Sequence, residues 1–186
     1  MKQTAAGLML MLALQGVASA HDMVSNRLSL VQREPNHVSM TLVIDYVNAM
    51  QAVAAPKASL KEFVIACSGM ADGPLQRTLG QAQLNIEQGI VLRDTQHRLL
   101  RVTALHWPSL ADARRLLQQA AMGSIALASD KPEPAALELQ ADVTSGQVID
   151  GIEIQLPPAL VDMTVVSYKP VQTRIDSLSH KATVRF

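Results

Sequence analysis

His21 is the residue whose place in the sequence points most directly to chemistry. It follows Ala18-Ser19-Ala20, a run of small residues typical of a signal-peptide cleavage site. Cleavage after Ala20 would leave His21 with a free α-amino group beside its imidazole. Imidazole nitrogen suits copper, and the amine adds a second ligand. His21 is therefore a candidate metal ligand, and copper is a candidate cofactor.

In this one respect the sequence is similar to several exported copper proteins that begin in the same way. The resemblance covers a single residue and does not extend to their other ligands. His37, His97, His106 and His180 lie far away in the sequence, and no methionine-rich loop accompanies them. The alternative is that His21 merely follows a cleavage site and binds nothing.

Contiguous catalytic motifs are absent from the sequence, which has no G-x-S-x-G, H-E-x-x-H or C-x-x-C and no glycine-rich phosphate loop. The carboxylates are scattered over expected loops and polar strand faces. Because folding joins distant residues, a hydrolase with a non-local site stays open. His106 precedes Trp107 at an expected strand end, where it would line a pocket or be half-buried and bonded to the backbone. His37 and His97 fall in expected turns.

Cys67 is the only cysteine, so the chain cannot contain an internal disulfide. It lies in the apolar run FVIACSGM, which favours a buried thiol that packs as a small hydrophobic side chain. A reactive thiol or a bond to another chain is the alternative.

Residues 1–20 have the order of a signal peptide, with Lys2, then the apolar residues 5–14, then the cleavage site. The apolar run is shorter than the roughly 20 residues that span a bilayer. We therefore expect a periplasmic or secreted protein, cut near Ala20, in which residues 21–186 form one domain.

Charge and composition limit the classes of binding partner that we expect for this chain. The 16 basic and 16 acidic residues cancel, which leaves no electrostatic footprint for nucleic acid. No later apolar run reaches transmembrane length, so we expect no transmembrane anchor. Hydrophobic residues make up 48% of the chain but aromatic residues only 3%, so the core should be mainly aliphatic.

Alternation of apolar and polar residues predicts strands around Leu28–Leu30, at 38–47, 137–143, 152–156, 163–168 and 171–175, and at the end, 182–186. Residues 90–108, which contain the only tryptophan, are typical of a hairpin, and we expect it in the middle of the sheet. Residues 48–57 are expected to form a loop, and 129–134 a polar linker.

Three helices are expected. Ser59 and Glu62 form a capping box before a helix that reaches Cys67. A second helix covers residues 75–87, with Leu75, Leu79, Ala82 and Ile86 on one face. A third begins after Ser109 and is expected to end at Gly123.

The fold class we expect is α+β, an antiparallel sheet of about six to eight strands with about three helices packed on it. The alternative is an immunoglobulin-like β-sandwich with a helical insertion at residues 59–87. The leading function is an exported, non-enzymatic binding or accessory protein of an envelope system, whose partner is an envelope protein or a small ligand. Copper binding through His21 and hydrolysis are the alternatives.

Overall fold

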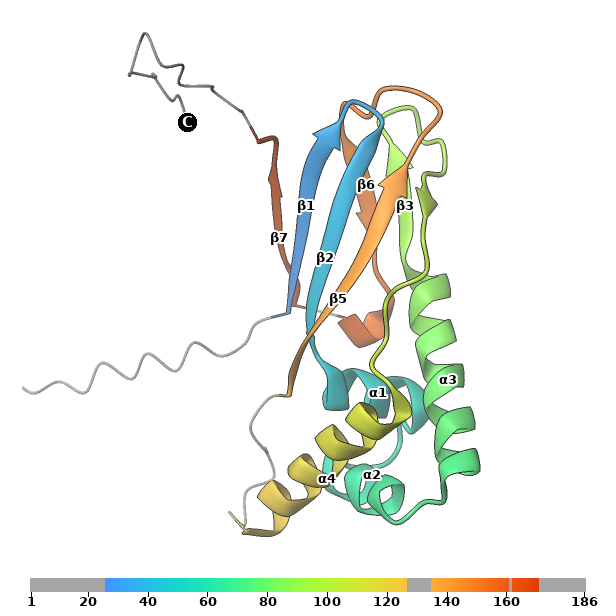
Figure 1. The fold of residues 1–186 in the computed structure, drawn as a ribbon, viewed down its shortest axis with the longest axis vertical. Helices are drawn as coiled ribbons and strands as arrows, with labels where there is room; N and C mark the ends of the chain where they lie inside the picture. Colours follow the sequence, from blue (N-terminus) through green and yellow to red (C-terminus); the bar gives the residue numbers. More distant parts are fainter. Residues whose placement is uncertain (1–25, 127–134, 161, 171–186) are drawn as a thin grey trace, which may run out of the picture.

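The computed structural model describes residues 26–126, 135–160 and 162–170, and these form a mixed α+β fold (Figure 1). The described strands are β1 (Arg27–Glu34), β2 (His37–Asp45), β3 (Val91–Asp94), β4 (Arg101–Val102), β5 (Ala136–Thr144), β6 (Ile152–Gln155) and β7 (Thr164–Tyr168). The described helices are α1 (Tyr46–Ala54), α2 (Leu60–Ser68), α3 (Asp72–Gly89), α4 (Leu110–Ala126) and the 3-10 turn η1 (Pro158–Leu160). The α+β class is confirmed, while the expected total of strands and the sandwich alternative stay predictions.

The larger sheet has five strands in the order β4-β5-β2-β1-β7, and the smaller pairs β3 with β6. In Figure 1 the helices gather at one end of the larger sheet, and β3 and β6 lie behind it. The pairs β1–β2, β2–β5 and β4–β5 are antiparallel, but β7 runs parallel to β1. The expectation of a purely antiparallel sheet is therefore wrong at the β7 edge.

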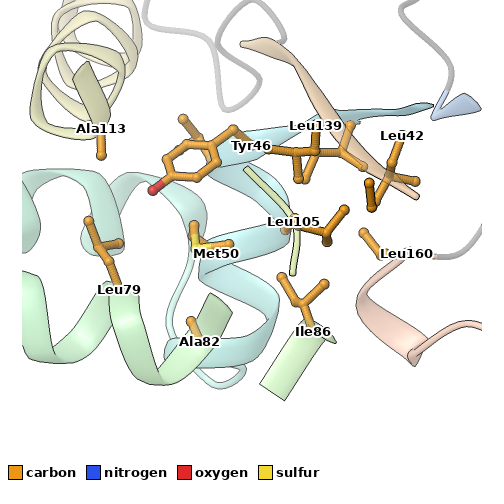
Figure 2. Close-up of a cluster of buried hydrophobic side chains, with 14 of the residues drawn as sticks. Leu42, Tyr46, Met50, Leu79, Ala82, Ile86, Leu105, Ala113, Leu139 and Leu160 are labelled. Carbon is orange, nitrogen blue, oxygen red and sulfur yellow. The ribbon is translucent and has the colours of Figure 1, made fainter. Parts of the chain in front are cut away.

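Strand β2 is the centre of the larger sheet. Its residues alternate between buried and half-buried, as the sequence predicts, because one face meets the core. Met40, Leu42 and Ile44 on that face are at most 1% exposed. They join a single cluster of buried side chains that includes Leu139 of β5 and residues from the four helices, among them Tyr46, Met50 and Leu79 (Figure 2).

The hairpin expected at residues 90–108 forms only at its turn, where the Leu100 N–H donates to Leu92 O at 2.9 Å. Its two arms then separate: β3 pairs with β6 in the smaller sheet, and β4 adds two residues to the edge of the larger one. The expectation that it lies mid-sheet is wrong. Alternation predicts a strand but carries no information about its partner, and β5 supplies the longer ladder to β2.

The loop expected at residues 48–57 is wrong, because helix α1 begins at Tyr46. Asp45 caps it: its side chain accepts from the Asn48 N–H at 3.2 Å. Tyr46 and Val47 are residue types that are common in strands. The predicted strand 38–47 therefore included the first two residues of helix α1. Once helical, they are buried together with Ala49 and Met50.

The other three helices lie where the sequence places them, although α3, expected at residues 75–87, is longer at both ends. The capping box of Ser59 and Glu62 is present, and the predicted apolar face of α3 is its buried face. Gly89 ends α3 against Pro157, and a Cβ at this position would lie 2.6 Å from the Pro157 Cβ. The expected end of α4 at Gly123 is wrong, because the helix continues to Ala126.

Several predictions concern residues outside the described ranges: the signal peptide and His21, the linker at 129–134, and the strands at 171–175 and 182–186. Within the described ranges, no helix combines the length and apolar character needed to cross a bilayer.

Candidate functional site

A groove of about 300 Å³ opens between the β7 edge of the larger sheet and the segment that leads into β6. One wall comes from the larger sheet and includes Leu30, Val165 and Ser167. The opposite wall comprises residues 149–152 and Ile154. Ser167 is paired with the buried Leu30, and Val165 with the buried Leu28, so both β7 side chains face inward between the sheets.

The main chain of β7 is the second component of this site. Among the described strands β7 pairs only with β1, and the Thr164 N–H donates to Asn26 O at 2.9 Å. In a parallel ladder the main-chain groups of alternate residues point to opposite sides. Val165 and Ser167 therefore direct their N–H and C=O groups away from β1. This edge has the groups needed to pair with another strand.

Apolar side chains of β7 lie on both of its faces. Val165 is 46%, Val166 40% and Tyr168 55% exposed, while the sequence TVVSY is typical of a strand with apolar contacts on both sides. Exposed apolar side chains beside an open strand edge are a feature that proteins usually avoid, because such edges attract other chains. The combination makes β7 a candidate docking surface.

The far wall of the groove is fixed by hydrogen bonds to the β1–β2 hairpin. The Gln32 side chain donates to Ile149 O at 2.8 Å, and the Ile149 N–H donates to Pro35 O at 2.7 Å. Gly151 packs so closely that a Cβ there would lie 2.9 Å from Thr95 Cγ2. The wall is therefore held at a fixed distance from β1.

The histidines of the described chain make surface contacts with carboxylates or the backbone. His37 Nε2 lies 2.8 Å from Asp142 Oδ1, and His97 Nδ1 lies 3.0 Å from Glu153 Oε2. His97 lies in a turn as expected, whereas His37 begins β2. The ring of His106 contacts Gln140 O at 3.0 Å, so its expected backbone bond is confirmed, but the side chain is exposed and not half-buried.

Three buried groups have pKa values that hydrogen bonding or burial shifts. The Arg98 side chain, together with main-chain N–H donors, lowers the pKa of Asp94 despite its burial. The Cys67 side chain is 2% exposed, which confirms that it packs in the core, and this burial raises the pKa of its thiol. Burial also raises the pKa of Tyr46 to about 12, although the Gln83 side chain acts in the opposite direction and lowers it. Within the described ranges, no group forms a hydrogen bond with the Tyr46 hydroxyl.

A smaller cavity of about 230 Å³ lies between the end of α3 and residues 102–105. Glu87 lines it and accepts a hydrogen bond of 2.7 Å from the Trp107 indole N–H. This contact was not foreseen, although a half-buried tryptophan usually finds an acceptor for its N–H. The bond anchors the segment before α4 to α3.

The predicted copper ligand His21 lies outside the described ranges. Within them, no three side chains of histidine, cysteine, aspartate or glutamate gather closely enough to hold a metal ion. Copper binding through His21 stays a prediction.

Comparison of the chain with protein-family models, with curated proteins and with solved structures gave no significant match.

Proposed function

We propose that this chain is an exported, non-enzymatic binding protein of the cell envelope that holds an extended segment of a partner protein along β7. The observation that carries the proposal is the coincidence of an open strand edge with a groove whose two walls carry apolar side chains beside polar ones. An added strand would bond to the main chain of Val165 and Ser167, and its alternate side chains would enter the groove. This combination is the basis of recognition by strand addition. Export is supported by the order of features in residues 1–20.

The main chain alone cannot provide strong binding. Two residues with outward N–H and C=O groups offer about four hydrogen bonds, each with a net contribution of about 0.5–1.5 kcal/mol. The resulting gain of about 2–6 kcal/mol is comparable with the cost of association. Affinity and specificity therefore depend on side chains that contact Leu30, Val165 and Ile154 in the groove.

A polypeptide fits this site better than a small ligand does. Pockets for small molecules usually have volumes of about 300–1,000 Å³ and enclose most of the ligand. The groove is at the lower limit of that range, and its β7 side is exposed along the whole strand. An extended segment can bond along this edge without being enclosed.

Site-specific cross-linking in the intact envelope tests the proposal. A photoreactive amino acid in place of Tyr168, which lines the groove, should cross-link to one extended segment of a partner, identified by mass spectrometry. Val165→Pro removes the outward N–H without breaking the β1 ladder and should abolish the product. Val165→Thr keeps that N–H and should preserve it. A product that survives Val165→Pro would refute strand addition.

Location and metal binding have a separate test. The intact mass of protein from the periplasmic fraction should correspond to a chain that begins at His21. Retention of one copper ion by that chain, and its loss in His21→Ala, would support the copper alternative. An uncleaved chain would refute export.

A further inference from the structure

We propose that residues 182–186 of this same chain pair with the open edge of β7 and occupy the groove, so that a partner segment must displace them. Only the displacement of this segment by a partner rests on the proposed function. The pairing itself rests on the open edge, on the groove and on the sequence that follows β7.

The sequence of this segment fits the groove. Ala182, Val184 and Phe186 alternate with Thr183 and Arg185, so a strand here has one apolar face and one polar face. Both walls of the groove carry apolar side chains, among them Leu30, Val165 and Ile154, together with polar ones such as Gln32 and Asp150, and the opposite face of β7 is exposed. The apolar face of the segment therefore matches the groove, and its polar face matches solvent.

The segment is also within reach. Lys169, directly after β7, already lines the groove, so the chain leaves the described structure at the site itself. Residues 171–181 then precede the segment and can extend over about 35 Å, at about 3.3 Å per residue. The edge of β7 is about half that length. A reversal of the chain followed by antiparallel pairing is therefore easily accommodated.

Antiparallel pairing also defines the contacts. Residues directly opposite each other on paired strands have side chains on the same face of the sheet. Since Val165 and Ser167 face inward, their opposite residues must come from the apolar set, with Val184 beside Val165 and Ala182 beside Ser167. A second copy could offer the same segment. The segment of the same chain has the advantage of an effective concentration on the order of millimolar.

Disulfide trapping in the full chain tests the pairing. In a Cys67→Ala background, Ser167→Cys is combined with Ala182→Cys and, as the control, with Thr183→Cys, while Val165→Cys is combined with Val184→Cys, and oxidised glutathione supplies the oxidant. A disulfide within one chain should form at least about tenfold faster in the pairs 167–182 and 165–184 than in the control pair 167–183, because directly opposite side chains are within disulfide distance and position 183 faces away. Equal rates in all three pairs would overturn the proposal. So would disulfides that form only between two chains, which would assign the groove to a second copy.

Displacement has its own measurement. Val184→Pro removes a main-chain N–H from the segment, so it should raise the yield of partner cross-links from position 168 severalfold. An unchanged yield, with the cross-link still sensitive to Val165→Pro, would refute self-occupation and leave the partner site intact. A third outcome would refute the partner site instead: disulfides form at positions 182 and 184, but no partner cross-links to position 168, even in Val184→Pro.

Discussion

The Gln32 side-chain amide donates a hydrogen bond of 2.8 Å to Ile149 O, which joins β1 to the opposite wall of the groove. These two residues are 117 positions apart in the sequence. The bond sets the position of residues 149–152 relative to the inward side chains of β7. Together with the hydrogen bond from the Ile149 N–H to Pro35 O, this glutamine holds the far wall of the groove.

Gln32→Ala should lower the free energy of unfolding by about 1 kcal/mol, the usual net value of one hydrogen bond. It should also weaken cross-linking from position 168, because the far wall is released. The matched control is Gln155→Ala at an exposed position of β6. Urea denaturation and cross-link yield measure the two effects. Equal behaviour of the two variants would show that Gln32 does not set the groove.

The capping box at the start of α2 should make a measurable contribution to stability. Ser59 Oγ accepts from the Glu62 N–H at 3.2 Å, and the Glu62 carboxylate accepts from the Ser59 N–H at 2.8 Å. Ser59→Ala should cost about 1 kcal/mol, and Ser59→Gly only a few tenths, because glycine is a tolerated cap. Thermal and urea unfolding give the comparison. An alanine variant as stable as the glycine variant would contradict the role of the cap.

The Asp94–Arg98 pair should make stability depend on pH in the acid range. Because the pKa of Asp94 is lowered in the folded chain, its contribution is complete above the ordinary aspartate pKa of about 3.9. The contribution is lost as the pH falls through the lower folded value, since unfolding then takes up a proton. Asp94→Asn should flatten the fall in the urea midpoint below about pH 4. Arg98→Gln should flatten it as well, and an unchanged acid limb in both variants would refute the assignment.

Cys67 should be unreactive in the folded protein. Its thiol is buried and its pKa is raised, so thiolate is scarce and reagents cannot reach it. Maleimide should label it about a hundredfold or more slowly than a cysteine at the exposed position 95, introduced as Thr95→Cys with Cys67→Ala. Full reaction in urea is the control. Rapid labelling of the native chain would contradict the burial.

The helices α2, α3 and α4 could be predicted because their signals are local. Caps such as Ser59 and apolar residues at helical spacing act within a few turns of chain. Helix α1 was missed because Tyr46 and Val47 favour a strand by side-chain type, while the cap at Asp45 decides otherwise. Strand positions were also predictable. Their partners were not, because alternation is the same whether a strand lies at the centre or at the edge, as for β4.

The groove could not be predicted from the sequence, since it depends on contacts between distant residues. Gln32 and Ile149 carry no local signal that they meet. One clue was present: Val165 and Val166 are adjacent, so β7 has apolar side chains on both faces, although β2 shows a similar break in alternation at Val43. Such a break in alternation indicates a strand that needs a second contact surface.

The most direct test of strand addition at β7 is the hydrogen-exchange rate of the Val165 and Ser167 amides, measured by NMR on the full chain. If the edge is paired, both amides should exchange at least about tenfold more slowly than in the Val184→Pro variant. Addition of the partner segment identified by cross-linking should protect them in that variant. Fast exchange of both amides in the full chain, and again with the partner segment present, would contradict strand addition at this edge.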